Sequence, residues 1–373
     1  MNPDVLIVGA GIIGAACADA LSARGLRVTV VERDAVGSGA TAAGMGHLVA
    51  MDDNAAELAL SAHSLELWKE LVEGQPERHE YSRCGTIWVA ADDEELEAAR
   101  AKAVTMSAHG LECAVIGAQE LYRLEPNLRP RLAGGLLVQG DGLVYPPKSA
   151  RILLARAVAR GASLAVGEVV ALEDGGVVLA DGTRLSAGQV VLAAGTRCLS
   201  LAPDLPLRPK KGHVMITDRY PGFVRHQLVE LGYIKSAHAS GGESVAFNLQ
   251  PRPTGQVLIG SSRQFDTVDL AAEPSMMARM LARAVEYTPA LAGLNILRCW
   301  TGLRAATPDG LPLIGPDPSR RNMWLATGHE GLGITTSLAT AELLAAQMAG
   351  GQAGIDLRPY LPSRFTAQGR AYG

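Results

Sequence analysis

The N-terminal part of the chain alternates between continuous apolar runs and an amphipathic stretch. Residues 4–8 form an apolar run of the kind found in strands buried on both faces. Residues 15–24 follow with a helical period, Gly25 ends that helix, and residues 27–31 predict a second strand that ends at Glu32. The pattern predicts a strand, a helix and a parallel strand, which is the opening unit of a nucleotide-binding α/β sheet.

The glycines between the first strand and the helix have a diagnostic spacing. Gly9, Gly11 and Gly14 form a G-x-G-x-x-G motif around Ile12 and Ile13. The three glycines allow, in turn, a tight turn, the approach of a pyrophosphate to the backbone, and close packing of helix on strand. The helix N-terminus then offers free N–H groups to the phosphates.

The acid at the end of the second strand narrows the choice of dinucleotide. Glu32 follows Gly14 by 18 residues, where a carboxylate accepts hydrogen bonds from ribose hydroxyls. A 2′-phosphate would be repelled there, which disfavours NADP. The motif alone leaves FAD and NAD open.

A loop of small side chains over residues 37–47 favours FAD. It contains Ser38, Gly39, Ala43 and Gly44, and its Met45 is unusual for a linker. Such a loop suits backbone pressed against a large flat ligand, although an ordinary flexible loop has a similar composition.

Two later segments point the same way. Residues 189–195 form a buried strand that ends in a glycine turn at Ala194 and Gly195. Residues 323–335 predict a strand, a glycine loop and the start of an amphipathic helix. In a flavoprotein, the N–H groups of a second helix N-terminus would face the pyrimidine carbonyl O2 of the flavin.

Between these nucleotide-type segments the chain has a different pattern of predicted elements. Strands are predicted over 85–90, 134–139, 245–250 and 256–260, with an acidic amphipathic helix over 92–109. We therefore expect an α/β fold: a Rossmann-type FAD-binding domain and an interleaved α+β substrate domain built on an antiparallel sheet. The expected FAD-binding segments are 1–80, 145–207 and 298–360, the substrate-binding segments are 81–144 and 208–297, and 361–373 is a C-terminal tail.

Composition excludes several functional classes. The 373 residues are 48% hydrophobic with a net charge of −4, so the chain is globular and nucleic-acid binding has no support. Five scattered cysteines form no zinc or iron–sulfur motif, and we expect no metal site. The first 16 residues lack the Lys or Arg that a signal peptide would carry, and Glu342 interrupts the longest later apolar stretch. We therefore expect a cytoplasmic protein without a membrane span.

These motifs together resemble the D-amino-acid oxidase superfamily of FAD oxidoreductases, in particular its glycine oxidase-like members and the flavin subunits of D-hydroxyproline dehydrogenases. The resemblance covers almost the whole chain, and its most specific parts are residues 300–315 and 328–333. It implies that FAD contacts Gly9, Gly11, Ile12, Ile13, Gly14, Glu32, Arg33, Ser38, Gly39, Ala43, Gly44, Met45, Val169, Ala194, Gly195, Gly328, His329, Gly331, Leu332, Gly333, Ile334 and Thr335.

The resemblance also implies substrate-binding residues. Arg304 closes a W-x-G-L-R pattern and is expected to bind the substrate carboxylate over the flavin, whereas composition alone would favour an exposed arginine. Asn248 and Gln250 match substrate-facing positions, with an exposed strand face as the alternative. His47 is a candidate catalytic residue, and His47 and His329 both lie in flavin-facing loops, where a structural role is favoured over that of a base.

Three sequence features modify the resemblance. The G-H-x-x-x-G loop reads Glu330-Gly331-Leu332 where glycine oxidase-like chains carry an arginine, which weakens glycine as the substrate. Residues 305–307 lack the cysteine that attaches FAD in some relatives, so we expect non-covalent FAD. The basic cluster of Lys210, Lys211 and His213 is expected to form a solvated face.

The reaction implied by the resemblance is oxidation of a small amino or imino acid, with hydride transfer to flavin N5. The best match is a D-hydroxyproline-type substrate and a dehydrogenase that passes electrons to partner subunits carrying further redox centres. Alternatives are a free-standing glycine, sarcosine or D-amino-acid oxidase that produces hydrogen peroxide, and an opine dehydrogenase flavin subunit. A non-enzymatic flavin-binding scaffold or a tRNA-modification module is the alternative of a different class.

Overall fold

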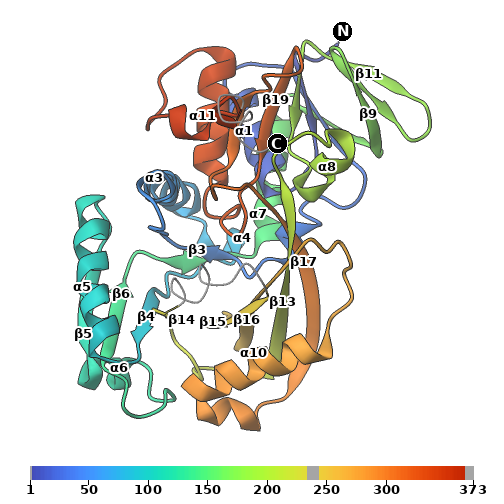
Figure 1. The fold of residues 1–373 in the computed structure, drawn as a ribbon. Helices are drawn as coiled ribbons and strands as arrows, with labels where there is room; N and C mark the ends of the chain where they lie inside the picture. Colours follow the sequence, from blue (N-terminus) through green and yellow to red (C-terminus); the bar gives the residue numbers. More distant parts are fainter. Residues whose placement is uncertain (1, 233–242, 366–373) are drawn as a thin grey trace.

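Two β-sheets, one above the other in Figure 1, organise the structure, which is a computed structural model. It describes residues 2–232 and 243–365. The chain passes between the sheets several times, so each sheet is assembled from segments far apart in the sequence.

The first sheet has six strands and contains the N-terminal run. Its order is β18 (Leu313–Pro316), β19 (Met323–Thr327), β12 (Gln189–Leu192), β1 (Val5–Val8), β2 (Val28–Glu32) and β8 (Ser163–Val166). All neighbouring pairs are parallel except β18 and β19. The strands predicted over 4–8 and 27–31 are confirmed as β1 and β2.

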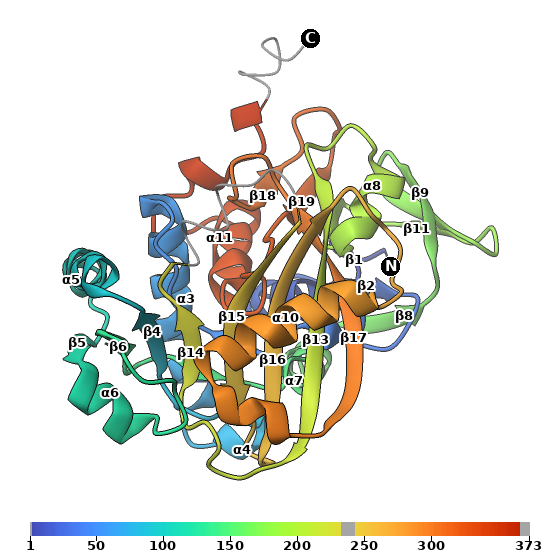
Figure 2. The same ribbon diagram turned by 60° about the horizontal axis from the view of Figure 1, so that its bottom comes forward.

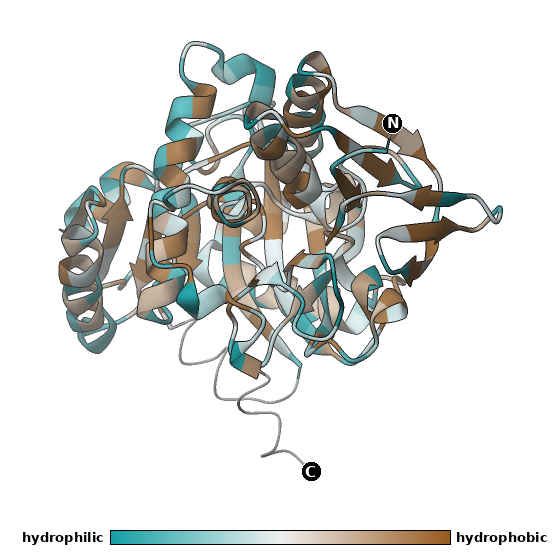
Figure 3. Ribbon diagram, turned by 90° about the horizontal axis from the view of Figure 1, so that it is seen from above, coloured by the Kyte–Doolittle hydropathy of each residue, from teal (hydrophilic) through white to brown (hydrophobic). Residues whose placement is uncertain are grey.

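Alternate side chains of these strands pack into two layers, because successive residues of a strand face opposite sides. Val5 and Ile7 face a helical layer, whereas Leu6 and Val8 face a small three-stranded sheet. The helices are α1 (Ile12–Ala23), α3 (Ala55–Val72), α7 (Pro146–Ala159) and α11 (Ser337–Ala349). The small sheet is β9 (Val169–Glu173), β10 (Gly176–Leu179) and β11 (Arg184–Ser186), next to α8 (Cys198–Leu201). Figure 3 shows hydrophobic residues concentrated on the strands and inner helices, and hydrophilic residues on outer turns.

The second sheet has eight strands. Its order is β17 (Ile296–Ala306), β13 (Arg208–Arg219), β16 (Gln256–Phe265), β15 (Ser244–Pro251), β14 (Gln227–Glu230), β4 (Thr86–Ala90), β6 (Gly134–Val138) and β5 (Cys113–Gly117). The prediction of an antiparallel sheet is correct for six of the seven pairings, but β14 and β4 are parallel. Strand β4 ends at Ala90 and β14 begins only at Gln227, so no hairpin joins these two strands and fixes their relative direction.

Helices cover the second sheet on its outer sides, as Figure 2 shows. The amphipathic helix α10 (Pro274–Tyr287) packs on β15 and β16 through Met276, Met280 and Ala284. Helices α5 (Asp93–Ala108) and α6 (Ala118–Leu124) pack at the β4–β6–β5 end. The predicted helix 92–109 is thus confirmed as α5.

The strand β17 changes the expected division of the chain. It pairs with β13 along nearly its whole length, so the second sheet continues to Ala306, and a boundary at residue 298 is wrong for the sheets. In the expected C-terminal tail 361–373, Arg364 forms an ion pair with Asp309, so residues 361–365 are attached to the rest of the structure. Residues 366–373 lie outside the described residues.

Short elements join the two sheets. The two-residue strands β3 (His47–Leu48) and β7 (Gly142–Leu143) pair with each other. The remaining elements of the described residues are α2 (Ala40–Ala43), α4 (Pro76–His79) and the 3-10 turns η1 (Gly195–Arg197), η2 (Pro289–Gly293) and η3 (Arg358–Tyr360). Within the described ranges, no helix combines the length and the apolar character needed to cross a membrane.

Candidate functional site

A cavity between the two sheets brings together most of the predicted substrate residues. Its walls come from the 40–57 segment, from β4, β13, β14, β15, β16 and β17, and from the loop after β19. The predicted residues that line it are Ala43, Gly44, Met45, His47, Asn248, Arg304, Gly331, Leu332 and Ile334.

The glycine motif forms the expected tight connection between β1 and α1. A Cβ atom on Gly14 would lie 1.9 Å from the carbonyl oxygen of Gly9, so any other residue would separate the helix from the strand. Glu32 accepts a hydrogen bond from the Ala10 N–H at 2.7 Å and another from the Asp34 N–H. The carboxylate is therefore held beside the motif at the end of β2.

Thr41 is a residue of this region that sequence reasoning did not identify. Its Oγ1 accepts a hydrogen bond from the Ile12 N–H at 3.0 Å, across 29 residues. The side chain thus caps α1 from the small-residue loop. A threonine among alanines and glycines was a visible signal, but its partner depends on the tertiary fold.

The backbone of two loops fits a dinucleotide with a flavin. Within the described ranges, no acceptor is assigned to the N–H groups of Gly11 and Ile13 at the start of α1. The same holds for the N–H groups of residues 333–335 after β19. Runs of free N–H groups at a helix start and in a turn bind anionic oxygens, as a pyrophosphate and a reduced flavin present. The residues present therefore fit FAD.

The second run of N–H groups differs in detail from the prediction. Helix α11 begins at Ser337, so residues 333–335 precede the helix as a turn and do not form its first residues. The turn is held by Trp68, whose Nε1 donates to the carbonyl oxygens of Ile334 and Thr335. Helix α3, which carries Trp68, therefore fixes the turn whose N–H groups are predicted to bind the flavin.

The small-residue loop 37–47 is clamped by the second sheet. Trp300 Nε1 donates to the Ala43 carbonyl at 3.0 Å, and Gln250 Nε2 donates to the Met45 carbonyl at 2.7 Å. A Cβ on Gly302 would lie 2.5 Å from the Ala43 Cβ, so β17 touches the loop directly. The loop is an anchored part of the cavity wall and not a flexible linker.

These contacts correct the expectation for Gln250. Its side chain is fully buried, it holds the loop, and it does not line the cavity. Asn248 points to the same side of β15 and does line the cavity. The alternative of an exposed strand face is wrong for both residues, because this side of the sheet faces the rest of the molecule.

Arg304 lies within β17 and reaches into the cavity. Its Nη1 donates to the Ser262 carbonyl at 3.3 Å, and a Cβ on Gly212 would lie 2.6 Å from its Nη2. The guanidinium is therefore stretched across the neighbouring strands β13 and β16. Its side chain is 24% exposed, so it is largely removed from bulk water while it still faces the cavity.

Glu330 balances part of the positive charge at the β17 end of the cavity. Its Oε1 lies 3.0 Å from Lys210 Nζ and 3.9 Å from Arg304 Nη1. Burial alone would raise the pKa of Glu330, but Arg304, Lys210 and Arg263 outweigh burial and lower the pKa to about 2. Sequence reasoning noted Glu330 only where an arginine was missing. The residues next to Glu330 in the sequence do not indicate that it lies close to cations on three strands.

The basic cluster after Pro209 is buried, which contradicts the expected solvated face. Lys211 and His213 are at most 1% exposed, and Lys211 Nζ pairs with Glu273 Oε1 at 3.0 Å. His213 bonds Ser262 Oγ and accepts from the Glu273 N–H. The expectation failed because these residues lie on a central strand, where the carboxylates that pair with them come from other segments.

The two histidines of the loops that are predicted to face the flavin differ in position. Burial, reinforced by Arg304, lowers the pKa of His47 to about 4, and its Nε2 has no partner among the described residues. His329 bonds Thr340 Oγ1 through Nε2 at 3.0 Å, and burial lowers its pKa to about 3. Both rings are neutral at pH 7. His47 faces the cavity, whereas His329 fixes its loop to α11.

The end of the cavity farthest from β17 contains further polar groups. Trp88 on β4 and Glu57 on α3 line it together with Asn248. Burial raises the pKa of Glu57 to about 7, and the nearby carboxylates Asp53 and Glu330 add to the shift. Sequence reasoning missed Trp88 and Glu57, because a tryptophan in an apolar strand and a glutamate near a helix start are both typical of ordinary structure.

The other predicted cofactor residues lie along the first sheet. Val169 begins β9 and is 5% exposed, and Ala194 and Gly195 follow β12. Arg33 pairs with Asp34 and Glu168 just beyond β2. Ser38 and Gly39 precede α2, and Gly328 follows β19.

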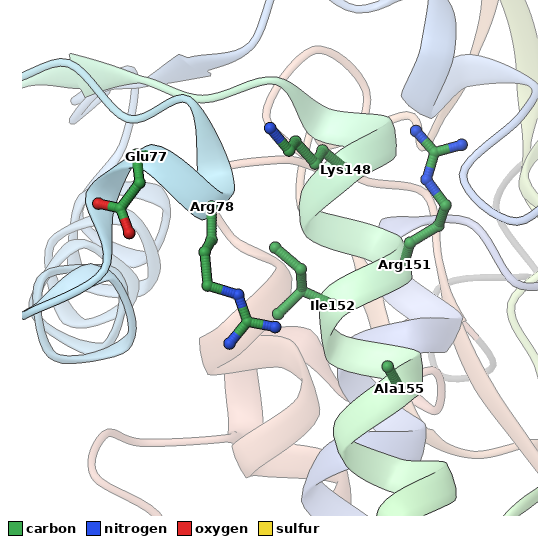
Figure 4. A pocket seen from close by; sticks show the side chains of 6 residues that line it. All are labelled: Glu77, Arg78, Lys148, Arg151, Ile152 and Ala155. Atoms are coloured by element: carbon green, nitrogen blue, oxygen red, sulfur yellow. The ribbon is translucent and has the colours of Figure 1, made fainter.

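A second hollow lies on the outside of α4 and α7, and Figure 4 shows its side chains. It is lined by Glu77, Arg78, Lys148, Arg151, Ile152 and Ala155. None of the predicted site residues lies there, and Arg78 and Lys148 already bond Gln75 and Glu80. Nor do the described residues contain a cluster of three or more metal-ligating side chains.

Comparisons with known proteins agree with this geometry. The profile of a family described as "FAD dependent oxidoreductase" matches residues 4–347. A glycine oxidase of Pseudomonas aeruginosa is 30% identical over 97% of this chain and 99% of its own. An opine oxidase subunit of Rhizobium meliloti is 26% identical over 98% of each chain. The crystal structure of glycine oxidase from Geobacillus kaustophilus matches 97% of this chain and 99% of its own, with a TM-score of 0.85 and 28% identity.

Proposed function

Because the chain belongs to the FAD dependent oxidoreductase family, we propose that it oxidises a small amino or imino acid at the carbon that bears the nitrogen. The best candidate is a D-hydroxyproline-type substrate, and the enzyme acts as a dehydrogenase. Support comes from the named activities of two relatives, a glycine oxidase and an opine oxidase, and from the polar groups of the cavity.

When bound, FAD would supply the hydride acceptor for this oxidation. The free N–H groups of Gly11 and Ile13 would hold its pyrophosphate, Glu32 its ribose hydroxyls, and residues 333–335 the flavin carbonyl. The five cysteines all lie in the described ranges and none of them lines the cavity, which supports non-covalent attachment.

The position of Arg304 is the observation that carries the proposal. Its guanidinium faces the cavity beside the flavin-facing loop 330–334 and is held by a carbonyl oxygen, so it keeps its orientation without a substrate. A fixed guanidinium binds a carboxylate through two parallel charge-assisted hydrogen bonds. A substrate held in this way has its Cα oriented before it reacts.

His47 completes the substrate environment. A neutral imidazole whose Nε2 has no partner among the described residues accepts a hydrogen bond from the substrate nitrogen and orients it. Its role is one of orientation. The low pKa makes it a weak base, so the amine proton leaves to solvent or to another group.

The proposed dehydrogenase passes its electrons to partner subunits. The opine oxidase relative is by its name one part of an assembly, and its similarity extends over 98% of this chain. The glycine oxidase relative supports the alternative, a free-standing oxidase that reduces oxygen to hydrogen peroxide.

An anaerobic bleaching screen tests the proposal. The FAD-loaded protein is mixed with D- and L-proline, the hydroxyproline isomers, glycine, sarcosine and opines, and flavin absorbance is followed. Bleaching by an amino or imino acid is the expected result, and bleaching by none of them while NADH reduces the flavin would overturn it. Admission of air then separates the two acceptors, since rapid recolouring indicates an oxidase and slow recolouring a dehydrogenase.

Acid precipitation tests the attachment of the cofactor. The yellow colour should appear in the supernatant, because none of the five described cysteines lines the cavity to form a covalent bond. Flavin that stays in the pellet would contradict non-covalent attachment.

A further inference from the structure

Buried polar atoms at the Trp88 end of the cavity lack partners. Among the described residues, no hydrogen bond is made by Trp88 Nε1, Asn248 Oδ1 or Glu57 Oε1. Trp88 is 2% exposed and Asn248 is 9% exposed, and all three residues line the cavity. Leaving such atoms unpaired costs free energy, so a cluster of them at one cavity wall indicates a ligand group that pairs with them.

The sheet register brings two of these groups onto one surface. Trp88 on β4 is the register partner of Val229 on β14, and Val229 is the partner of Asn248 on β15. Register partners point to the same face of a sheet, and all three residues line the cavity. The opposite face carries Ile87, Leu228 and Leu249, which pack into the core with α10. Trp88 and Asn248 thus flank the apolar side chain of Val229 on the cavity floor.

We infer that Trp88 and Asn248 form a subsite for a hydroxyl group of the substrate, with Glu57 at its edge. This inference rests on the proposed function and specifies its substrate class: an amino or imino acid with a hydroxyl remote from the carboxylate.

The chemistry of the unpaired atoms selects a hydroxyl. Among the described residues, Trp88 Nε1–H is a donor without an acceptor, and Asn248 Oδ1 is an acceptor without a donor. A hydroxyl group accepts from the first and donates to the second. An ammonium group would leave the indole N–H unpaired. A carboxylate would leave Asn248 Oδ1 unpaired and would meet the carboxyl groups of Glu57 and Asp53.

The spacing of the cavity fits a small substrate. The Arg304 guanidinium lies against Ser262 on β16, and Gly260, two residues earlier on that strand, is the register partner of Asn248. One strand spacing of ~4.8 Å and two residues of ~3.3 Å each place the Asn248 backbone ~8 Å from the guanidinium contact. A five-membered imino acid with a ring hydroxyl spans such a gap from its carboxylate to its hydroxyl.

A matched pair of unreactive ligands tests the subsite without turnover. Cyclopentanecarboxylate and 3-hydroxycyclopentanecarboxylate lack the amine, so neither can be oxidised. Their dissociation constants on the FAD-loaded protein are read from the change in flavin absorbance. The hydroxylated ligand should bind ~10-fold more tightly or better, because a site built for a hydroxyl is left unpaired by its analogue. Equal binding would overturn the inference.

Two variants locate the preference in the named residues. Trp88→Phe removes the N–H and keeps a ring, and Asn248→Leu removes the amide and keeps the shape. Each should lower the ratio of the two dissociation constants by ~2- to 10-fold, the range for one hydrogen bond. Trp324→Phe, a tryptophan of β19 outside the cavity, is the matched control and should keep the ratio. If both cavity variants kept the parental ratio, the assignment of the subsite to Trp88 and Asn248 would be overturned. The comparison of the two ligands on the parent protein tests the subsite even if a variant fails to fold.

Substrate kinetics separate this inference from the proposed function. The parent should reduce its flavin with one epimer of 4-hydroxy-D-proline at a kcat/KM ~10-fold above that with D-proline. Equal rates with both, together with equal ligand binding, overturn the subsite and leave the proposed function intact. Tighter binding of the hydroxylated ligand without bleaching by any amino or imino acid keeps the subsite and overturns the proposed function. A preference for a D-amino acid with a charged side chain also overturns the subsite.

Discussion

Two half-buried glutamates of the same cavity have pKa values displaced in opposite directions. Glu330 lies among Lys210, Arg263 and Arg304, and these cations outweigh burial and lower its pKa to about 2. Glu57 lies toward Trp88, where burial and the carboxylate of Asp53, together with Glu330 across the cavity, raise its pKa to about 7. One end of the cavity is thus cationic around a permanent carboxylate, whereas the other contains a carboxyl group that titrates near neutrality.

The difference assigns separate tasks to the two ends. A cationic end attracts the substrate carboxylate and orients it. An end with unpaired neutral groups and a half-protonated acid rejects a second carboxylate and suits a neutral polar substituent. Under the proposed function, a substrate with one carboxylate would therefore bind with that carboxylate at the cationic end.

The largest expected effect comes from removing Arg304, one of the cations that line the cavity. Arg304→Leu should lower flavin reduction at low substrate concentration by roughly 30- to 4000-fold, since loss of one partner of a desolvated pair costs about 2–5 kcal/mol. Arg304→Lys should lie between this variant and the parent, because an ammonium keeps the charge but loses the two-pronged geometry. Stopped-flow reduction with the best substrate measures both.

A control on the same strand sharpens the test. Arg298 is exposed on β17 and outside the cavity, so Arg298→Leu should change reduction little. If Arg304→Leu reduced its flavin at the parental rate and affinity, the carboxylate would have to bind elsewhere, around Lys210, Lys211 or Arg263.

Glu330→Gln should have the next largest effect, on stability. The pKa of Glu330 is lowered from 4.5 to about 2, so its stabilising contribution is present above pH 4.5 and is lost as the pH falls through about 2. At pH 7 the variant should lose about 1–3 kcal/mol, because Lys210 and Arg304 lose their anion in a partly buried place. Thermal unfolding between pH 3 and 8 measures this, with the exposed Glu97→Gln as control. If Glu330→Gln lost thermal stability at low pH in the same way as the parent, the lowered pKa of Glu330 would be refuted.

Glu57→Gln should have the smallest effect and the opposite sign. The pKa of Glu57 is raised from 4.5 to about 7, so the parent is favoured below pH 4.5 and loses this contribution as the pH rises through about 7. Glutamine does not ionise, so the variant does not lose stability in this way. Between pH 5 and pH 8 its free energy of unfolding should therefore rise by about 1 kcal/mol relative to that of the parent. The same unfolding series measures it, and a loss of relative stability over this range would contradict the comparison.

Local patterns were sufficient for the first strand–helix–strand unit and for β12. The motif Gly9–Gly14, the acid at Glu32 and the strand before Ala194 depend on neighbours a few residues away, and the structure places them as expected. Such segments carry their geometry in their own spacing, because a glycine turn and a buried strand are short-range features.

The substrate side depended on pairings across the chain. The burial of Lys211 follows from its position on a central strand opposite Glu273, which no local pattern indicates. Gln250 shares a face with Asn248 but bonds the Met45 carbonyl, so one of two equivalent-looking residues lines the cavity. The parallel pairing of β14 with β4 places Trp88 opposite Val229, which in turn lies opposite Asn248. These outcomes require the register of eight strands.

The anchoring of the small-residue loop by Trp300 and Gln250 has a consequence for folding cooperativity. The loop caps α1 through Thr41 and is bonded by β15 and β17, so it belongs to both layers of the molecule. A ligand that binds the native loop stabilises the folded state by mass action, and here that stabilisation extends to both layers. Loss of the cofactor should therefore loosen the distant sheet as well as the nucleotide site, and the two halves should melt in one transition when the protein is saturated with FAD.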